Sequence, residues 1–413
     1  MSDLLLRNIR SLWQADPDNA ALRAGADMAH LPVIHNAWLL CANGRIKAFG
    51  PRETCPERAD ETLDVSGRHV LPAWCDSHTH IVFAASREEE FVDRIRGLSY
   101  EEIAGRGGGI LNSARKMQDA DEAALLAGAR NRLYDMIAQG TGAIEIKSGY
   151  GLSLESELKM LRVIRALKAE SPIPIKATFL GAHAIPTEYR DNREGYLNLL
   201  ISEMLPRVCG EGLADYCDVF CDKGFFTPEE TDRILKAAAR YGLKAKIHAN
   251  ELGYTGGVQV GVANGAVSVD HLEYCGEEEI ACLLGSGTLP TLLPACAFFL
   301  GIPYAPARRM IDAGLPVVLA TDHNPGSAPS GNMPFVLSLA CIKMKMLPEE
   351  AVNAATLNGA AAMEIAGDYG SIVVGKSANL VISRPIESLA YLPYSFGANL
   401  VEQMVLNGRI WKP

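Results

Sequence analysis

The sequence contains no apolar run long enough to cross a bilayer, and the run Leu4–Leu6 is too short for a signal peptide. It has no excess of basic residues either, because 39 Lys and Arg stand against 49 Asp and Glu, for a formal net charge of −10. An acidic chain of this kind is poorly suited to bind nucleic acid or an anionic membrane. We therefore expect a cytoplasmic protein whose partners include no membrane and no nucleic acid.

The sequence also lacks any Cys-x-x-Cys pair among its ten cysteines. Several of them, such as Cys41, Cys217 and Cys341, lie inside apolar runs that are typical of strands. This pattern argues against a disulfide framework and against a thiolate metal site. We expect buried free thiols in a reducing compartment.

Core-forming residues are abundant, since 48% of the 413 residues are hydrophobic and 21% are charged. These fractions are those of a globular protein with a large core. The length exceeds that of one ordinary domain and fits a large α/β barrel with an accessory domain.

Both ends of the chain have the pattern of β-structure. Asn43-Gly44 separates two apolar runs, and Asn407-Gly408 does the same near the C-terminus, which predicts a hairpin at each end. Residues 370–375 and 379–382 are also expected to form strands. We therefore predict one small, β-sandwich-like domain built from residues 1–69 and 366–413.

Residues 70–365 alternate between short apolar runs and segments with the spacing of amphipathic helices, such as Leu154–Ile164 and Glu229–Tyr241. Eight such runs predict the strands of a closed (β/α)8 barrel of the TIM type, an α/β fold. The first crossover, about residues 76–141, is long, and Arg106–Gly109 within it predicts a mobile lid. The eight runs are Val70–Cys75, Ala143–Ile146, Pro174–Leu180, Tyr216–Phe220, Ala245–Ile247, Ala266–Val269, Thr288–Leu293 and Pro316–Ala320.

Polar residues with catalytic chemistry lie at or just after the ends of these predicted strands. In a barrel the carboxyl ends of all strands meet at one mouth, so these side chains should converge there. This gathering of polar residues at the predicted strand ends predicts a hydrolase with a metal at its centre. The set consists of His78, His80, Lys147, Tyr150, His183, Asp222, His248, Glu251, His271, Asp322 and Asn324, whereas His30, His35, His69 and His323 are not assigned to the site.

Four of these residues have the types and spacing of metal ligands. His78 and His80 alternate on an extended segment and so offer two imidazoles to one point. His248 adds a third nitrogen and Asp322 an oxygen, which leaves a position for water, as a catalytic zinc-type site requires. A metal there brings the pKa of that water towards neutrality, and Asp322 is placed to accept its proton.

Three further residues are candidates for proton transfer and charge stabilisation. Glu251, three positions beyond the third histidine ligand, is expected to carry a proton to the leaving nitrogen. His271 and His183 are expected to hydrogen-bond a carbonyl oxygen as negative charge develops on it. Other roles stay open at this point: a barrel-core histidine for His271, a solvated carboxylate for Glu251, and structural ion pairs for Lys147 and Asp222.

The ligand pattern resembles that of the amidohydrolase superfamily, with His-x-His after strand one, His after strands five and six, and Asp after strand eight. Binuclear members bridge two metals with a carboxylated lysine or a glutamate after strand four. Here that region reads Cys221-Asp222-Lys223-Gly224, without a clear bridge. The resemblance therefore implies one ion per subunit, Zn²⁺ or Fe³⁺, since three nitrogens and one oxygen suit both metals.

Longer motifs resemble the imidazolonepropionase family within that superfamily. This resemblance implies hydrolysis of the cyclic amide C–N bond of 4-imidazolone-5-propanoate to N-formimidoyl-L-glutamate, a step of histidine degradation. Two departures are His323, where an aromatic or apolar residue is expected, and Asn379, where the superfamily often has Asp. The motifs are His78–Phe91, Gly107–Leu111, Glu145–Leu152, Phe179–Ala184 and Thr321–Ser327, so they extend over almost the whole chain.

The resemblance also implies roles for individual residues. The Arg87 guanidinium is suited to a bidentate grip on the substrate propanoate. Tyr150 and the backbone N–H groups around Gly326 and Ser327 are expected to complete that anion site. The implied metal ligands are His78, His80, His248 and Asp322, and the implied substrate contacts are Arg87, Tyr150, His183, Glu251, Asn324, Gly326 and Ser327.

Two other interpretations remain open from the sequence. One is another cyclic amidohydrolase, or an aminohydrolase acting on a heterocyclic base, which would have no use for Arg87. The other is an inactive scaffold, although such proteins typically lose ligands and all four are present here. A homodimer is the default expectation for a soluble enzyme.

Overall fold

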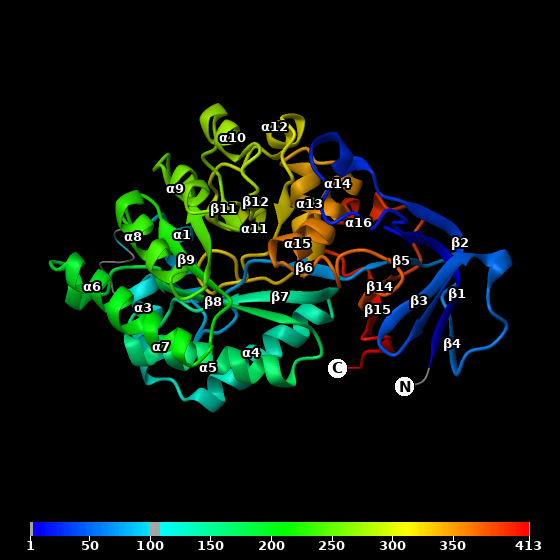
Figure 1. Cartoon of the computed structure of the whole chain (residues 1–413), viewed down its shortest axis with the longest axis horizontal. Coiled ribbons are helices and arrows are strands. Elements are labelled where there is room, and N and C mark those ends of the chain that lie inside the picture. Colours follow the sequence, from blue (N-terminus) through cyan, green and yellow to red (C-terminus); the bar gives the residue numbers. More distant parts are fainter. Residues whose placement is uncertain (1–2, 99–101, 103–107, 413) are drawn as a thin grey trace.

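Strands from the two ends of the chain lie in one sheet in the computed structural model, which describes residues 3–98, 102 and 108–412. The strand order is β16-β15-β14-β5-β1-β2-β3, and β4 pairs with β1. Figure 1 shows the N-terminal strands in blue beside the C-terminal strands in red. The strands are β1 (Leu4–Trp13), β2 (Val33–Ala42), β3 (Arg45–Pro51), β4 (Glu61–Asp64), β5 (His69–Pro72), β14 (Leu380–Ser383), β15 (Val401–Leu406) and β16 (Arg409–Ile410).

Apolar side chains from both chain ends share one core in this sheet. Leu6, Leu39 and Val70 from the N-terminal strands pack with Leu380 and Val405 from the C-terminal strands, and all five are buried. The predicted β unit built from both termini is confirmed.

Both predicted hairpins are confirmed. β2 and β3 pair antiparallel across Asn43-Gly44, and β15 and β16 pair across Asn407-Gly408. All four turn residues have positive φ, between 48° and 81°. Asn and Gly tolerate this left-handed conformation, which tight hairpin turns require.

The strand predicted over residues 370–375 is wrong. Within it only Ile372 pairs, in an isolated bridge with Ala15. Gly370 and Gly375 have φ of 85° and 95°, so the extended backbone is interrupted at both ends of the segment.

The second sheet consists of eight parallel strands whose order in the sheet is their order in the chain, from β6 to β13. Helices surround it, as Figure 1 shows. All eight predicted runs therefore supply barrel strands, and the (β/α)8 fold is confirmed. The strands are β6 (Trp74–Asp76), β7 (Thr141–Lys147), β8 (Ile175–Ala182), β9 (Tyr216–Cys221), β10 (Lys244–Ala249), β11 (Ser268–His271), β12 (Leu289–Leu292) and β13 (Val318–Leu319).

The first predicted barrel strand, Val70–Cys75, is divided between the two sheets. β5 pairs with β14 of the terminal sheet up to Pro72, whereas β6 pairs with β7 of the barrel from Trp74 onward. The N–H of Ala73 donates to Asn379 O and that of Trp74 donates to Gly140 O. The chain therefore changes sheets at Ala73, and the domain limits at residues 69 and 365 stay a prediction.

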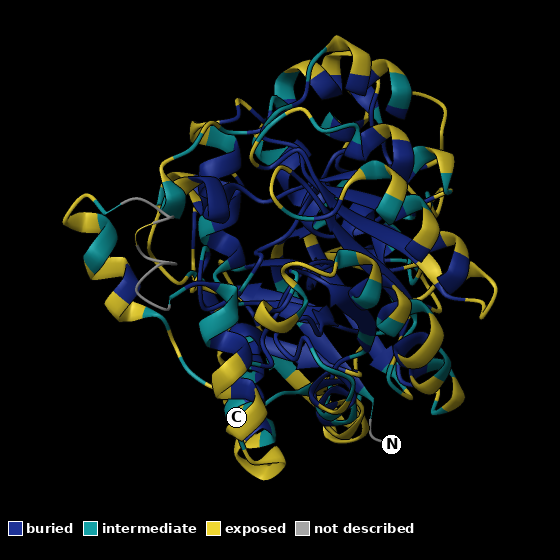
Figure 2. Ribbon diagram, turned by 90° about the vertical axis from the view of Figure 1, so that its left-hand side faces the viewer, coloured by how far each residue is buried: buried dark blue, intermediate teal, exposed yellow. Residues whose placement is uncertain are grey.

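The helices lie outside the barrel with their apolar faces turned inward, so that Figure 2 shows buried strands surrounded by helices exposed on one side. The predicted helical spacing is confirmed in α5 and α8. The α-helices are α1 (Glu88–Ile95), α3 (Ile110–Asp119), α4 (Glu122–Ile137), α5 (Leu154–Glu170), α6 (Arg193–Leu199), α7 (Leu205–Gly210), α8 (Pro228–Ala239), α9 (Gly257–Ala263), α10 (Glu277–Leu283), α11 (Pro294–Leu300), α12 (Ala307–Asp312), α13 (Met333–Ile342), α14 (Pro348–Ala355), α15 (Leu357–Ala362) and α16 (Tyr391–Tyr394). Short 3₁₀ turns cover Gly25–Ala29, Arg52–Thr54 and Thr187–Tyr189, and one π-helical turn covers Leu200–Met204.

The barrel closes just beyond the ends of its first and last strands. Thr79 and His323 form a parallel bridge, the N–H of Asp322 donates to His78 O, and the N–H of His80 donates to His323 O. The seam of the barrel is thus made by the segments that carry three of the four predicted metal ligands.

The long first crossover holds α1, α3 and α4. The predicted lid at Arg106–Gly109 lies partly outside the described residues, which resume at Gly108. Gly109, with φ of 83°, precedes the first turn of α3. Among the helices of the described chain, none has both the length and the apolar character needed to cross a membrane.

Candidate metal centre and catalytic pocket

A cavity of about 430 Å³ lies at the carboxyl ends of the barrel strands. Its walls include almost every residue that the sequence assigned to the site, and His78 lies directly behind His80. Predicted residues that line it are His80, Arg87, Tyr150, His183, His248, Glu251, His271, Asp322, Asn324, Gly326 and Ser327.

Three of the four predicted metal ligands, His78, His80 and Asp322, place one atom each within 4.8 Å of the other two, and His248 lies beside His80. Nε2 of His80 lies 3.2 Å from Nε2 of His78 and 3.5 Å from Nε2 of His248. Oδ1 of Asp322 lies 3.5 Å from Nε2 of both His78 and His80. Ligands held about 2.0–2.2 Å from a tetrahedral zinc ion are separated by about 3.3–3.6 Å, so the donor set fits a metal.

The ionisation of these histidines also suits ligation. Burial and the neighbouring Lys147 charge hold the pKa of His78 well below its ordinary value. Burial and His248 do the same for the pKa of His80. Both imidazoles are therefore neutral, as a metal ligand must be.

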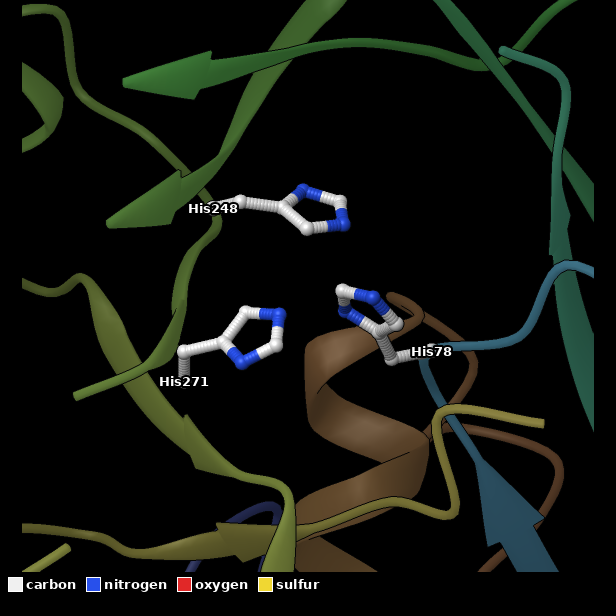
Figure 3. Close-up of side chains that lie close together, drawn as sticks. All are labelled: His78, His248 and His271. Atoms are coloured by element: carbon white, nitrogen blue, oxygen red, sulfur yellow. The ribbon is translucent and has the colours of Figure 1, made fainter. Parts of the chain in front are cut away.

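His271 approaches these ligands from the end of β11, and Figure 3 shows its ring beside those of His78 and His248. One ring nitrogen from each of the three lies within 4.8 Å of the other two. Nε2 of His271 is 3.8 Å from Glu251 and Nδ1 is 3.6 Å from Glu273. Burial alone would lower its pKa, but these carboxylates outweigh burial and raise the pKa of His271 well above its ordinary value. A protonated imidazole has no free lone pair, so His271 differs in kind from the predicted ligands.

The other ring nitrogens of two ligands are held by carboxylates. Nδ1 of His78 donates to Asp270 at 2.6 Å, and Nδ1 of His248 donates to Asp218 at 3.0 Å. Such a contact places the proton on Nδ1 and aims the Nε2 lone pair at the metal position. Nδ1 of His80 has no hydrogen-bond partner among the described residues.

Glu251 is positioned by the strand-four carboxylate. Asp222 accepts hydrogen bonds from the N–H groups of Glu251, at 2.7 Å, and of Leu252, at 3.0 Å. The thiol of Cys296 donates to Glu251 at 3.5 Å. Of the two roles left open for Asp222, the contacts favour the structural one, because its oxygens hold the loop that carries Glu251.

The backbone is strained where the site residues leave their strands. Asp322 has φ of 55°, and His271 and Leu272 have φ of 85° and 66°. Non-glycine residues rarely adopt this conformation, and such strain is concentrated at functional sites.

Burial, reinforced by the Glu251 charge, raises the pKa of Asp322 to about 7.

Arg87 forms one wall of the cavity as a buried ion pair with Glu90. Nε and Nη2 of Arg87 lie 2.9 and 2.5 Å from the same Glu90 oxygen, and the other oxygen accepts the N–H of Gly109 at 3.0 Å. The remaining nitrogen, Nη1, lies against Gly326, where any side chain would overlap with it. The absence of a side chain at Gly326 thus leaves space for the guanidinium.

The loop after the last strand, where an anion site is predicted, makes hydrogen bonds of its own. The N–H groups of Gly326 and Ser327 both donate to Oδ1 of Asn324, at 2.8 Å each. Nδ2 of Asn324 in turn donates to the Asp322 carbonyl at 2.7 Å. These N–H groups are thus already hydrogen-bonded within the turn, where the Asn324 side chain is their acceptor. That these N–H groups bind the propanoate stays a prediction, and Asn324 orders the loop that carries Asp322.

The hydrogen bond of His183 bears on its predicted role as a donor to the carbonyl oxygen. Its Nδ1 donates to the Gly149 carbonyl at 2.9 Å, and burial lowers its pKa to about 3. A neutral imidazole with its proton on Nδ1 has an accepting Nε2. Since His183 lines the cavity, Nε2 is suited to accept a hydrogen bond from a substrate N–H.

Sequence reasoning missed the charged residues inside the barrel and the partners of Arg87 and His271. The available signal was the alternation of side chains along a strand. Residues two positions apart, such as 145 and 147 or 246 and 248, lie on the same face of one strand. His323 points away from the cavity as expected, towards Met136 and Phe83. The missed residues are Glu90, Glu145, Asp218, Lys246, Asp270, Glu273 and Cys296.

Comparison with known proteins shows the family of this chain. The Amidohydrolase family model matches residues 69–410, most of the chain. The chain belongs to the amidohydrolase family. Two relatives named imidazolonepropionase match this amidohydrolase over 98% of its length and 99% of their own: one from Flavobacterium johnsoniae at 55% identity and one from Christiangramia forsetii at 54%. The resemblance found in the motifs is thereby confirmed.

Solved structures confirm the fold of this amidohydrolase. An adenosine deaminase from Xanthomonas campestris with bound zinc superposes with a TM-score of 0.70, covering 99% of this chain and 92% of its own, at 17% identity. An atrazine chlorohydrolase from Arthrobacter aurescens complexed with zinc gives a TM-score of 0.71, covering 98% and 94%, at 16% identity. At this level of identity the likeness concerns the fold alone.

Proposed function

We propose that this amidohydrolase hydrolyses the cyclic amide C–N bond of 4-imidazolone-5-propanoate to N-formimidoyl-L-glutamate, as a step of histidine degradation. The name shared by its relatives supports the substrate. The observation that carries the proposal is a cavity lined both by the proposed metal ligands His80, His248 and Asp322 and by the Arg87 guanidinium. The metal ligands suit a hydrolytic reaction, and the guanidinium suits the binding of a substrate carboxylate.

The proposed metal ligands are His78, His80, His248 and Asp322, holding one Zn²⁺ or Fe³⁺ ion. When bound there, the ion supplies a Lewis acid that lowers the pKa of a coordinated water. The region after strand four adds no second set of ligands, because Asp222 is committed to the backbone of the Glu251 loop.

The overall reaction consumes one water. The water oxygen forms a bond to the ring carbonyl carbon, the bond from this carbon to the ring nitrogen breaks, and that nitrogen takes up a proton. The former carbonyl becomes a carboxylate and the nitrogen becomes part of the formimidoyl group. The second proton of the water stays on the product, because the formimidoyl group is a basic amidine, and no proton is released overall.

Three residues of the chain move or balance protons and charge in this reaction. Asp322 accepts a proton from the attacking water. Glu251, held by Asp222 and Cys296, passes a proton to the leaving nitrogen. His271, kept protonated by its carboxylate neighbours, donates to the carbonyl oxygen as negative charge develops there.

Other residues of the cavity bind the substrate. Arg87 and the Tyr150 hydroxyl contact the propanoate, and Gly326 leaves space for the guanidinium. His183 accepts a hydrogen bond from a ring N–H. Asn324 and Ser327 hold the loop at the floor of this region. A homodimer and a cytoplasmic location are further parts of the proposal.

The test is turnover of 4-imidazolone-5-propanoate by the purified protein before and after removal of metal with a chelator. We expect activity to be lost on chelation and restored by Zn²⁺ or by iron, with one ion bound per chain. Fully metallated protein that leaves this substrate intact would overturn the proposed substrate. Turnover that survives complete removal of metal would overturn the proposed site.

A further inference from the structure

The barrel interior beneath the proposed metal ligands contains a cluster of charged side chains. The interior of such a barrel is ordinarily filled by branched apolar residues. Here two lysines and three carboxylates occupy it, and none is exposed to solvent. We name this set the interior charge cluster, which consists of Glu145, Lys147, Asp218, Lys246 and Asp270.

Lys147 lies at the centre of the cluster and touches all three carboxylates. Its Nζ donates to Glu145 at 2.6 Å and to Asp218 at 2.8 Å. A third oxygen, Oδ2 of Asp270, lies 3.7 Å away. Glu145 is further held by Lys246 and by the hydroxyl of Thr178.

Two of these carboxylates are the ones that orient the proposed ligands. Asp218 divides its oxygens, with Oδ2 on Lys147 and Oδ1 on Nδ1 of His248. Asp270 uses Oδ2 for Nδ1 of His78, and its Oδ1 accepts from Ser268 at 2.5 Å. Lys147 is therefore one contact away from two different metal ligands.

Lys147 limits where these two carboxylates can lie. Its Nζ donates to Oδ2 of Asp218 at 2.8 Å and lies 3.7 Å from Oδ2 of Asp270. Each carboxylate in turn accepts a hydrogen bond from Nδ1 of one imidazole. One ammonium group thereby helps to hold the orientation of two imidazoles.

We propose that Lys147 is a positioning residue for the metal centre, acting through Asp218 and Asp270 on His248 and His78. This inference rests on the proposed function, because it takes those two histidines as metal ligands. Lys147 does not line the cavity, so it acts without touching the substrate.

The experiment measures the Zn²⁺ affinity of wild type and Lys147→Met by competition with a chelator. Loss of a partner of this kind weakens metal binding by about 10- to 100-fold, and we expect a decrease in this range. In protein loaded with Co²⁺, the visible absorption spectrum should also change, because it reports ligand geometry. Lys376→Met is the matched control: Lys376 is also buried but donates to Ala366 O and Ser371 Oγ, outside the site. Its Zn²⁺ affinity should stay at the wild-type value.

Asp218→Asn tests the same set of contacts by changing Asp218, the residue between Lys147 and His248. If Lys147 acts through Asp218, the double variant loses less Zn²⁺ affinity than the sum of the two single losses. Strictly additive losses would overturn the inference, as would a Lys147→Met variant with wild-type affinity. If Lys147→Met does not fold, unchanged Zn²⁺ affinity in both Asp218→Asn and Asp270→Asn overturns it, and a decrease in both supports it. Wild-type protein that binds neither Zn²⁺ nor Fe³⁺ would instead contradict the proposed function.

Discussion

Arg87 and Glu90, three positions apart, form a buried ion pair in which both Nε and Nη2 of the arginine contact one carboxylate oxygen. The second oxygen of Glu90 accepts the N–H of Gly109, so the guanidinium is tied to the start of α3. Arg87 therefore enters the cavity with its orientation already fixed. Pre-orientation reduces the entropy lost when an anionic group binds.

We expect Arg87→Met to raise KM for 4-imidazolone-5-propanoate on the order of 10- to 100-fold, the loss of a charge-assisted hydrogen bond. The kcat should change less, because the propanoate is bound equally in ground and transition states. Steady-state kinetics on the full substrate give both constants. The control is an imidazolone without the propanoate, whose turnover should be similar in both proteins. An unchanged KM would contradict the assignment of Arg87.

Because Glu90 titrates, the contribution of this ion pair to the stability of the folded protein depends on pH. Although burial opposes ionisation, its contacts with Arg87 and Gly109 lower the pKa of Glu90 below the usual 4.5. A depressed carboxylate pKa stabilises the folded state above the unfolded pKa, and this contribution is lost as the pH falls through the folded pKa. Glu90→Gln should therefore have a lower Tm than wild type near pH 7, with the difference narrowing below about pH 4.5. A Tm difference that stays constant over this range would argue against the pair.

Gly326→Ala tests the space beside Arg87 without removing any charge. A Cβ at this position overlaps with Nη1 of Arg87, so the guanidinium must move. We expect KM to rise, as in Arg87→Met, with metal content unchanged. Gly210→Ala is the matched control, because a Cβ there meets nothing within 4 Å. Equal KM values for these two alanine variants would show that the Arg87 position is unimportant.

Glu251→Gln keeps the shape of the side chain but removes its ability to transfer a proton. We expect kcat to fall by about 10²- to 10⁴-fold, with bound metal retained. Single-turnover kinetics and metal analysis on the same sample separate the two effects. Glu278→Gln, at an exposed position on α10, should leave kcat unchanged. Wild-type kcat in Glu251→Gln would assign proton transfer to another group.

Asn379 joins the terminal sheet to the barrel. Its Nδ2 donates to Gly142 O at 2.9 Å, and its Oδ1 accepts the N–H of Asn407 at 2.8 Å. Asn379→Asp, which restores the residue common in the superfamily, replaces the buried donor by a carboxylate oxygen facing a carbonyl. We expect a loss of about 1–3 kcal/mol in the free energy of unfolding, measured with urea.

Asn399→Asp is the control for this change. Asn399 makes the same kinds of contact, donating to Ala138 O at 3.2 Å and accepting from Val401 N at 3.0 Å, but it is exposed. Water can solvate the new carboxylate there, so the loss should be much smaller. Equal losses in the two variants would show that Asn379 has no special role at the junction.

The sequence predicted the barrel and the site through two simple regularities. Eight apolar runs separated by helical spacing predict the strands, and polar residues just beyond them predict the mouth, which is why His78 and His248 could be paired across the barrel. The contacts of Asn324 were not predictable in this way, because a turn that engages its own N–H groups has the same residues as one that binds an anion. The role of Lys147 also depends on which strands are adjacent, information that spacing along one strand does not contain.

The seam of the barrel joins residues that are far apart in the chain. Thr321 donates to Asp76 through both its N–H and its hydroxyl, across 245 positions, and the neighbouring His78, His80 and Asp322 share the proposed ion. Joining the two ends of so long a segment costs chain entropy, which an ion held by both ends helps to offset. An ion bound there would be a removable cross-link as well as a catalytic group. Thermal stability of this enzyme should rise with the concentration of free metal.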